Sequence, residues 1–77
     1  MTKLPRGITG KRLLRALGRL GFTVVSVSGS HHYLRNPVTG RATVVPVHGG
    51  KHTIPTGTLS AILRQAGIAI EKLQSAL

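Results

Sequence analysis

A helical period of apolar residues marks the first structured segment, from Lys11 to Leu20. Its leucines recur at i, i+4 and i+7, the spacing that lines one face of an α-helix: Leu13, Leu17 and Leu20. Thr9 precedes the segment as a candidate N-cap, and Gly21 follows it where a left-handed residue commonly ends a helix. Gly18 inside the segment costs about 1 kcal/mol relative to alanine, which suggests that it permits a close approach by another element.

Three short segments rich in valine and threonine then predict β-strands: Phe22–Val27, His31–Arg35 and Arg41–Pro46. The turn Ser28-Gly29-Ser30 and a hairpin loop at residues 36–40 separate them. Alternation along the middle strand places its side chains on two faces, with His31, Tyr33 and Arg35 on one and His32 and Leu34 on the other. Pro46 has no amide hydrogen, so it belongs at a strand end or a sheet edge.

The helical period returns after a polar, glycine-rich connection at residues 47–57, with apolar side chains at i, i+3, i+4 and i+7: Leu59, Ile62, Leu63 and Ala66. Thr56 or Thr58 is expected to cap this helix, and Gly67 to end it. Residues 70–77 predict one or two further helical turns. The order α-β-β-β-α favours an α+β fold, a three-stranded antiparallel sheet with helices on one face and the other face open to a ligand.

The length of 77 residues predicts a single domain, residues 1–77, with residues 1–8 as a loose lead-in to the first helix. A chain of this size has room for one small core and one shallow site. No apolar run approaches the length of a membrane span, and no secretory leader is recognisable at the N-terminus. We therefore expect a cytoplasmic protein with no membrane partner.

Charge is the strongest compositional signal, because 11 lysines and arginines face one acidic residue, Glu71, and the net charge is +10. The missing carboxylates exclude paired-carboxylate hydrolysis and carboxylate cages for Ca²⁺ or Mg²⁺. The absence of cysteine excludes disulfides, a thiolate nucleophile and cysteine-type zinc sites. An excess of this size attracts polyanions, and nucleic acid is the first candidate partner.

Histidine is the remaining side chain suited to acid–base chemistry near neutral pH, and the chain has four: His31, His32, His48 and His52. Neighbours on a strand point to opposite faces, and the later pair lacks a third ligand, so no metal site and no cofactor are expected. Each histidine also has an ordinary interpretation as a hydrogen-bonded surface residue. His31 differs in context, because it follows a tight turn and shares a strand face with Tyr33 and Arg35. That setting suits proton transfer in cleavage of RNA, whose own 2′-hydroxyl can attack the phosphate.

Four segments in this order resemble the HicA family of bacterial type II toxins, also described as YcfA-like: residues 17–22 (LGRLGF), 29–33 (GSHHY), 44–48 (VVPVH) and 57–68 (GTLSAILRQAGI). The resemblance covers roughly residues 11–73. It implies an αβββα fold like that of the double-stranded-RNA-binding domain. It also implies a small ribonuclease that cleaves messenger RNA and halts translation, and a HicB-like antitoxin that binds the toxin and occludes its active site.

The resemblance also implies site residues. The catalytic histidine of the family lies in a Gly-Ser-His motif, which maps to Gly29, Ser30 and His31, and the family's Pro-x-His motif makes His48 the candidate second group. Family members often carry a basic residue just before the first motif, where this chain has Val27-Ser28. The candidates for RNA contact are therefore basic residues elsewhere: Arg12, Arg15, Arg19, Arg35, Arg41 and Lys51.

These observations favour a metal-independent endoribonuclease toxin that uses His31 as general acid or base. Two alternatives remain at the level of the sequence. One is a basic RNA-binding module of the same fold that does not cleave, and the other is a ribosome-associated or assembly protein. The Gly29-Ser30-His31 turn is the feature that separates the first interpretation from the others, because a binding module has no need of a histidine there.

Overall fold

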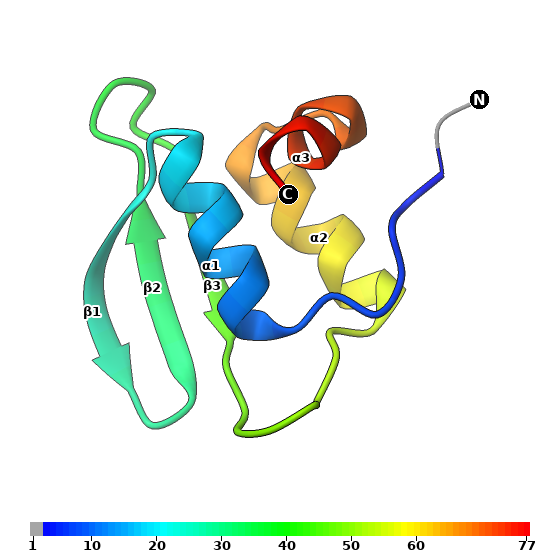
Figure 1. Cartoon of the computed structure of the whole chain (residues 1–77). Helices are drawn as coiled ribbons and strands as arrows, with labels where there is room; N and C mark the ends of the chain where they lie inside the picture. The colour runs from blue at the N-terminus through cyan, green and yellow to red at the C-terminus, as the bar shows by residue number, and fades with distance from the viewer. Residues whose placement is uncertain (1–2) are drawn as a thin grey trace.

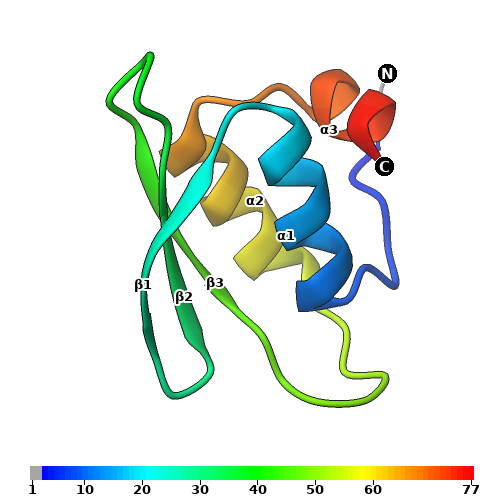
Figure 2. The same cartoon turned by 60° about the vertical axis from the view of Figure 1, so that its left-hand side comes forward.

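The computed structural model describes residues 3–77, which form three helices and three strands. Their order along the chain is α1 (Gly10–Arg19), β1 (Thr23–Ser28), β2 (His31–Arg35), β3 (Ala42–Pro46), α2 (Thr56–Ala66) and α3 (Ile70–Ala76). The strands pair antiparallel in the order β1-β2-β3, and the helices lie together on one side of this sheet (Figures 1 and 2). The α+β class and the αβββα order predicted from the sequence are confirmed, with α3 as the minor C-terminal helix.

Local signals explain where most of the elements begin and end. The Thr9 side chain accepts a hydrogen bond from the Arg12 amide at 3.2 Å, which confirms the predicted N-cap of α1. Gly67 ends α2 in the left-handed conformation, with φ of 68°. The predicted threonine cap of α2 is wrong. Thr56 is already the first helical residue, so Pro55 occupies the N-cap position, and its ring has no oxygen that could accept a cap hydrogen bond.

The hydrophobic core lies between the helices and the inner face of the sheet. The fully buried side chains come from every element except β1: Leu13, Leu17, Leu34, Val45, Leu59 and Leu73, together with Ile8 from the segment before α1. In the predicted lead-in, Met1 and Thr2 lie outside the described residues, and residues 3–7 form no helix or strand. Ile8, by contrast, belongs to the core.

Strand register separates the two faces of the sheet, because residues directly opposite each other point to the same side. Leu34 lies opposite Thr43 and is buried against the helices, and the Thr43 hydroxyl donates to Gln65 Oε1 of α2 at 3.0 Å. His31 lies opposite Pro46 and points the other way. The helices therefore cover one face and leave the other open, as predicted. Each helix described in residues 3–77 is too short or too polar to cross a membrane.

Among the glycines, the closest approach to another backbone segment occurs at Gly10 rather than at Gly18. A Cβ atom at Gly18 would meet no described atom within 4 Å, so the contact predicted there is wrong. A Cβ atom at Gly10 would lie 2.5 Å from the Pro46 carbonyl oxygen and 2.9 Å from Val47 Cα. The start of α1 thus rests directly on the end of β3, which is also the end of the sheet where His31 lies.

Candidate active site on the open face of the sheet

A two-residue turn, Gly29-Ser30, joins β1 to β2 and presents His31. Gly29 has φ of 57°, in the left-handed region, and Ser30 does not, which fits a type II′ turn with glycine at its first central position. A Cβ atom at Gly29 would meet nothing within 4 Å among the described atoms, so glycine is needed here for its backbone conformation rather than for space. The turn fixes the register of the hairpin, with Ser28 opposite His31.

His31 is exposed at the first position of β2, on the face that the helices leave uncovered. The register surrounds it with Ser28 of β1 on one side and Pro46 of β3 on the other. The next row on the same face holds Ser26, Tyr33 and Val44. Tyr33 is 38% exposed, and its position two residues along β2 corresponds to about 7 Å. In the two rows of the sheet at His31, the other polar side chains on this face therefore all carry hydroxyls.

The serine hydroxyls beside His31 were not singled out from the sequence. Ser28 and Ser26 come to the same face only because β1 pairs with β2 in the register of a two-residue turn. The sequence does contain a signal for this register in Gly29-Ser30, because a two-residue loop places the residues that flank it directly opposite each other. Tyr33 was assigned to the correct face by alternation but not to the site.

A hydrogen bond joins the two histidine motifs. The Val47 amide donates to the Ser30 carbonyl oxygen at 2.7 Å, so the pairing of β3 with β2 continues past Pro46. His48 is the next residue and is exposed in the following loop, where its ring lies edge-on to His52 with 6.0 Å between ring centroids. The Gly-Ser-His turn and the Pro-x-His segment thus meet at one end of the sheet.

The loop that carries His48 is held at both of its ends. Val47 bonds to the turn before His31, while the Ile54 amide donates to the Ile8 carbonyl oxygen at 2.7 Å. Beside the loop lies a hollow of about 390 Å³ whose basic lining groups are Lys11 and His48. A backbone fixed in this way presents His48 and Lys51 at a defined place next to the His31 end of the sheet.

His32 occupies the opposite face from its neighbour, as alternation predicted. It is half-buried, pairs with the fully buried Val45, and its Nδ1 atom lies 3.4 Å from the Ser30 carbonyl oxygen. His31 and His32 consequently do not converge on one point. In the part of the chain that the structure describes, no three side chains of the histidine, cysteine, aspartate or glutamate type cluster as metal ligands would.

Two of the predicted RNA-binding arginines also make contacts within the fold. Arg19 Nη1 donates to the Ala76 carbonyl oxygen at 2.7 Å, which ties α1 to α3. The Arg41 guanidinium lies against Gly67, where a Cβ atom would come within 3.1 Å of it. Gly67 ends α2, so Arg41 places a cation at the negative end of that helix dipole.

The remaining candidate cations are dispersed. Arg35 shares the open face with His31, but its position four residues along β2 corresponds to about 13 Å. Lys51 is exposed in the loop after His48. Arg12 and Arg15 are exposed on α1, in the helix layer on the other side of the sheet from His31. The structure therefore gathers histidines and hydroxyls at the open end of the sheet and leaves the arginines around it.

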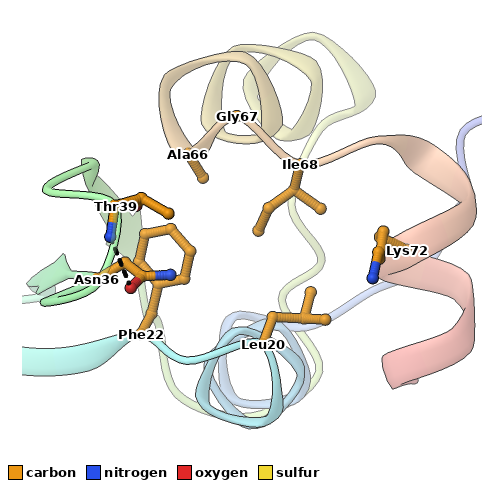
Figure 3. A pocket seen from close by; sticks show the side chains of 8 residues that line it. All are labelled: Leu20, Phe22, Asn36, Thr39, Ala66, Gly67, Ile68 and Lys72. Atoms are coloured by element: carbon orange, nitrogen blue, oxygen red, sulfur yellow. Dashed lines mark hydrogen bonds between the residues drawn. The ribbon is translucent and has the colours of Figure 1, made fainter.

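A second concavity lies at the other end of the sheet, away from the predicted catalytic histidines. It has a volume of about 200 Å³ and is mainly apolar, with Leu20, Phe22 and Ile68 pointing into it (Figure 3). Asn36, at its edge, accepts hydrogen bonds from the Val38 amide at 2.9 Å and the Thr39 amide at 3.3 Å. Asn36 therefore holds the β2–β3 loop, and this pocket does not belong to the His31 site.

Comparison with models of known protein families identifies the family of this chain. Residues 10–68 match the family model described as HicA toxin of bacterial toxin-antitoxin. The matched region runs from the first residue of α1 to just beyond α2 and includes both histidine motifs. No match was found among curated proteins. Because the match spans well over half of the chain and agrees with the resemblance of its motifs, the chain belongs to the HicA family, the toxins of bacterial toxin–antitoxin systems, whose partner is an antitoxin.

Proposed function

We propose that this toxin is an endoribonuclease that cleaves messenger RNA without a metal ion, with His31 as general acid or base, and that the cleavage inhibits translation and growth. One observation carries the proposal. His31 stands exposed on the open face of the sheet, at a turn that is hydrogen-bonded to the segment leading into His48. A pair of histidine motifs brought to one end of a strongly basic fold suits acid–base chemistry on a phosphodiester.

The proposed reaction needs no group beyond the chain and its RNA. A base takes the proton of a 2′-hydroxyl, O2′ forms a bond to the adjacent phosphorus, and the bond from phosphorus to O5′ breaks. An acid delivers a proton to the departing O5′. The products are a 2′,3′-cyclic phosphate and a 5′-hydroxyl. One histidine cannot be base and acid within the same step, so His31 supplies one role and His48 is our first choice for the other, with a basic side chain as the second choice.

The surroundings of His31 suggest how the phosphate is held. Ser28 and Tyr33 flank His31 on the same face and carry hydroxyls that can donate to phosphate oxygens. Lys51 lies in the loop after His48, Lys11 lines the hollow beside that loop, and Arg35 shares the open face at about 13 Å along β2. The net charge of +10 draws the RNA in, and the same charge suits a HicB-like antitoxin with an acidic surface that blocks the site.

A second candidate function is a basic RNA-binding protein of the same fold that does not cleave. The observation that favours it is the position of the α1 arginines Arg12 and Arg15, on the side of the sheet away from His31. Such a protein would bind mainly through phosphate contacts and lose affinity steeply as salt rises.

Cleavage of a single-stranded RNA by the purified chain in excess EDTA distinguishes these functions. We expect cleavage to persist in EDTA, and we expect a substrate with 2′-deoxyribose at the cleaved nucleotide to resist it, because the attacking oxygen is then missing. A wild-type chain that binds the RNA and never cuts it would favour the binding module. Cleavage that disappears in EDTA and returns with added metal would contradict the metal-independent mechanism.

A further inference from the structure

β1 is an edge strand that the rest of the fold leaves bare. It pairs with β2 alone in the described chain, and all six of its residues are exposed. Its three valines are the clearest case, with Val24 47% exposed, Val25 60% and Val27 55%. An edge strand presents a row of unpaired backbone amides and carbonyls, so β1 offers both hydrogen-bonding groups and apolar side chains.

The helices do not reach this strand. Val24 and Val27 lie opposite Leu34 and His32, which face the helix layer, yet α1 and α2 pack against β3 rather than β1. Figures 1 and 2 both show α1 between the β1–β2 hairpin and α3. Arg19 bonds to α3 from one flank of α1, so the opposite flank, which helical spacing assigns to Leu14 and Gly18, faces the hairpin side. The exposed valines of β1 and the half-buried Leu14 on this flank of α1 therefore form an apolar strip that the described elements cover only in part.

The other edge strand, β3, differs from β1 in two respects. Its side chains Thr43 and Val45 are buried on the face toward the helices, and the strand ends in Pro46, which has no amide to offer. Native edge strands usually carry charged side chains, proline, a β-bulge or a cover against unwanted pairing. β1 contains neither proline nor a charged residue, and the register shift between Val24 and Ser26 is the only feature of this kind in the strand. We infer from this exposed, uncharged edge that β1 is covered in the complex in which the protein functions.

The distribution of charge indicates which kind of molecule binds the edge of β1. Residues 20–34 contain no lysine or arginine, so the exposed valines of β1 offer RNA phosphates nothing to bind, whereas apolar side chains of a protein can cover them. A second copy of this chain would also carry +10, and repulsion disfavours pairing of two such edges. An acidic protein meets neither obstacle. Its apolar side chains can cover the valines while its carboxylates reach Lys11 and Arg15, which border Leu14 and Gly18 on α1.

We propose that a strand of the antitoxin adds to the free edge of β1, with apolar side chains on Val24 and Val27 and carboxylates toward Lys11 and Arg15. The proposal rests on the toxin assignment and specifies where the partner binds. An added strand would lie two strand spacings, about 10 Å, from the strand that bears His31. It would therefore place the body of the antitoxin beside the active end of the sheet without requiring contact with His31 itself.

The test compares two valine variants for binding to the protein encoded by the reading frame adjacent to this chain's gene. Val27→Glu puts a carboxylate on the proposed surface, and we expect at least tenfold weaker binding. Val38→Glu makes the same change in the β2–β3 loop, where Val38 is 91% exposed, and we expect binding within twofold of wild type. Both side chains are solvent-accessible, so equal thermal melting midpoints would show that the fold is retained. Hydrogen exchange of the wild-type complex should show new protection of amides in residues 23–28.

Equal binding by the two variants would overturn the proposal, as would protection that avoids β1. If the wild-type chain alone is a dimer and the Val27→Glu variant is a monomer, the edge of β1 binds a second copy of the chain. That result would also overturn the proposal. RNA cleavage is measured in the same preparations and reports separately on the ribonuclease. A Val27→Glu chain that still cleaves RNA but escapes inhibition by the partner supports the proposal. A wild-type chain that binds the partner through β1 and cuts no RNA contradicts the ribonuclease alone.

Discussion

Replacing His31 with alanine is expected to lower the rate of RNA cleavage by about 10²- to 10⁴-fold, the range usual for loss of a general acid or base. RNA affinity should stay within about twofold of wild type, because the exposed cations of the chain are unchanged. His31 is exposed and contributes nothing to the core, so stability should change by less than about 0.5 kcal/mol. Single-turnover cleavage of a labelled RNA in EDTA, beside a binding titration, measures both quantities.

His32→Ala is the matched control. The two histidines are adjacent on β2, but His32 faces the helix layer and pairs with the buried Val45. Its cleavage rate should remain within a few-fold of wild type, while His48→Ala should show a loss comparable to that of His31→Ala if His48 is the second group. If His31→Ala cleaves RNA at the wild-type rate, or if His32→Ala loses as much cleavage rate as His31→Ala, the assignment of His31 is refuted.

Gly10→Ala is expected to destabilise the protein by about 1–3 kcal/mol, the usual effect of forcing an extra methyl group into a packed contact. The added Cβ would lie 2.5 Å from the Pro46 carbonyl oxygen and 2.9 Å from Val47 Cα, and backbone atoms cannot rotate away as side chains do. Relief requires α1 to move from the end of β3. Because Val47 is bonded to the Ser30 carbonyl just before His31, we also expect slower RNA cleavage by the folded variant.

Gly18→Ala provides the control within the same helix. A Cβ atom there meets no described neighbour within 4 Å, so the ordinary helix preference for alanine applies and stability should rise by about 0.5–1 kcal/mol. For a chain of this size, 1 kcal/mol corresponds to about 4–8 °C in Tm. Urea or thermal unfolding of the two variants should therefore give shifts of opposite sign. A Gly10→Ala chain as stable as wild type would contradict the close packing of α1 on β3.

Much of the fold can be predicted from the sequence because its local signals agree with its long-range packing. The leucine stripe of α1 and the apolar period of α2 supply six of the 14 buried apolar residues in the described chain. Gly29-Ser30 defines a hairpin, and alternation along β2 assigns His31 and His32 to opposite faces. The candidate site follows from the same two signals, since the turn and the strand start present His31 on the face that the helices do not cover.

The parts that the sequence does not reveal depend on tertiary contacts. Both glycines of α1 look alike in a helical pattern, and only the position of β3 makes Gly10 the close contact. The sequence predicts Arg19 and Arg41 as RNA-binding cations, but it does not reveal their contacts with α3 and with the end of α2. The valines of β1 read as half-buried strand residues, yet they are exposed because the helices pack on β3.

Chemical analysis of the RNA ends left by the wild-type chain in EDTA tests the central claim most directly. Attack by the substrate's own 2′-hydroxyl, with His31 moving a proton, predicts fragments that end in a 2′,3′-cyclic phosphate and begin with a 5′-hydroxyl. Mass spectrometry of a short defined RNA distinguishes these ends from their hydrolytic counterparts. Fragments with 3′-hydroxyl and 5′-phosphate ends, which require attack by water, would contradict the mechanism proposed for this toxin.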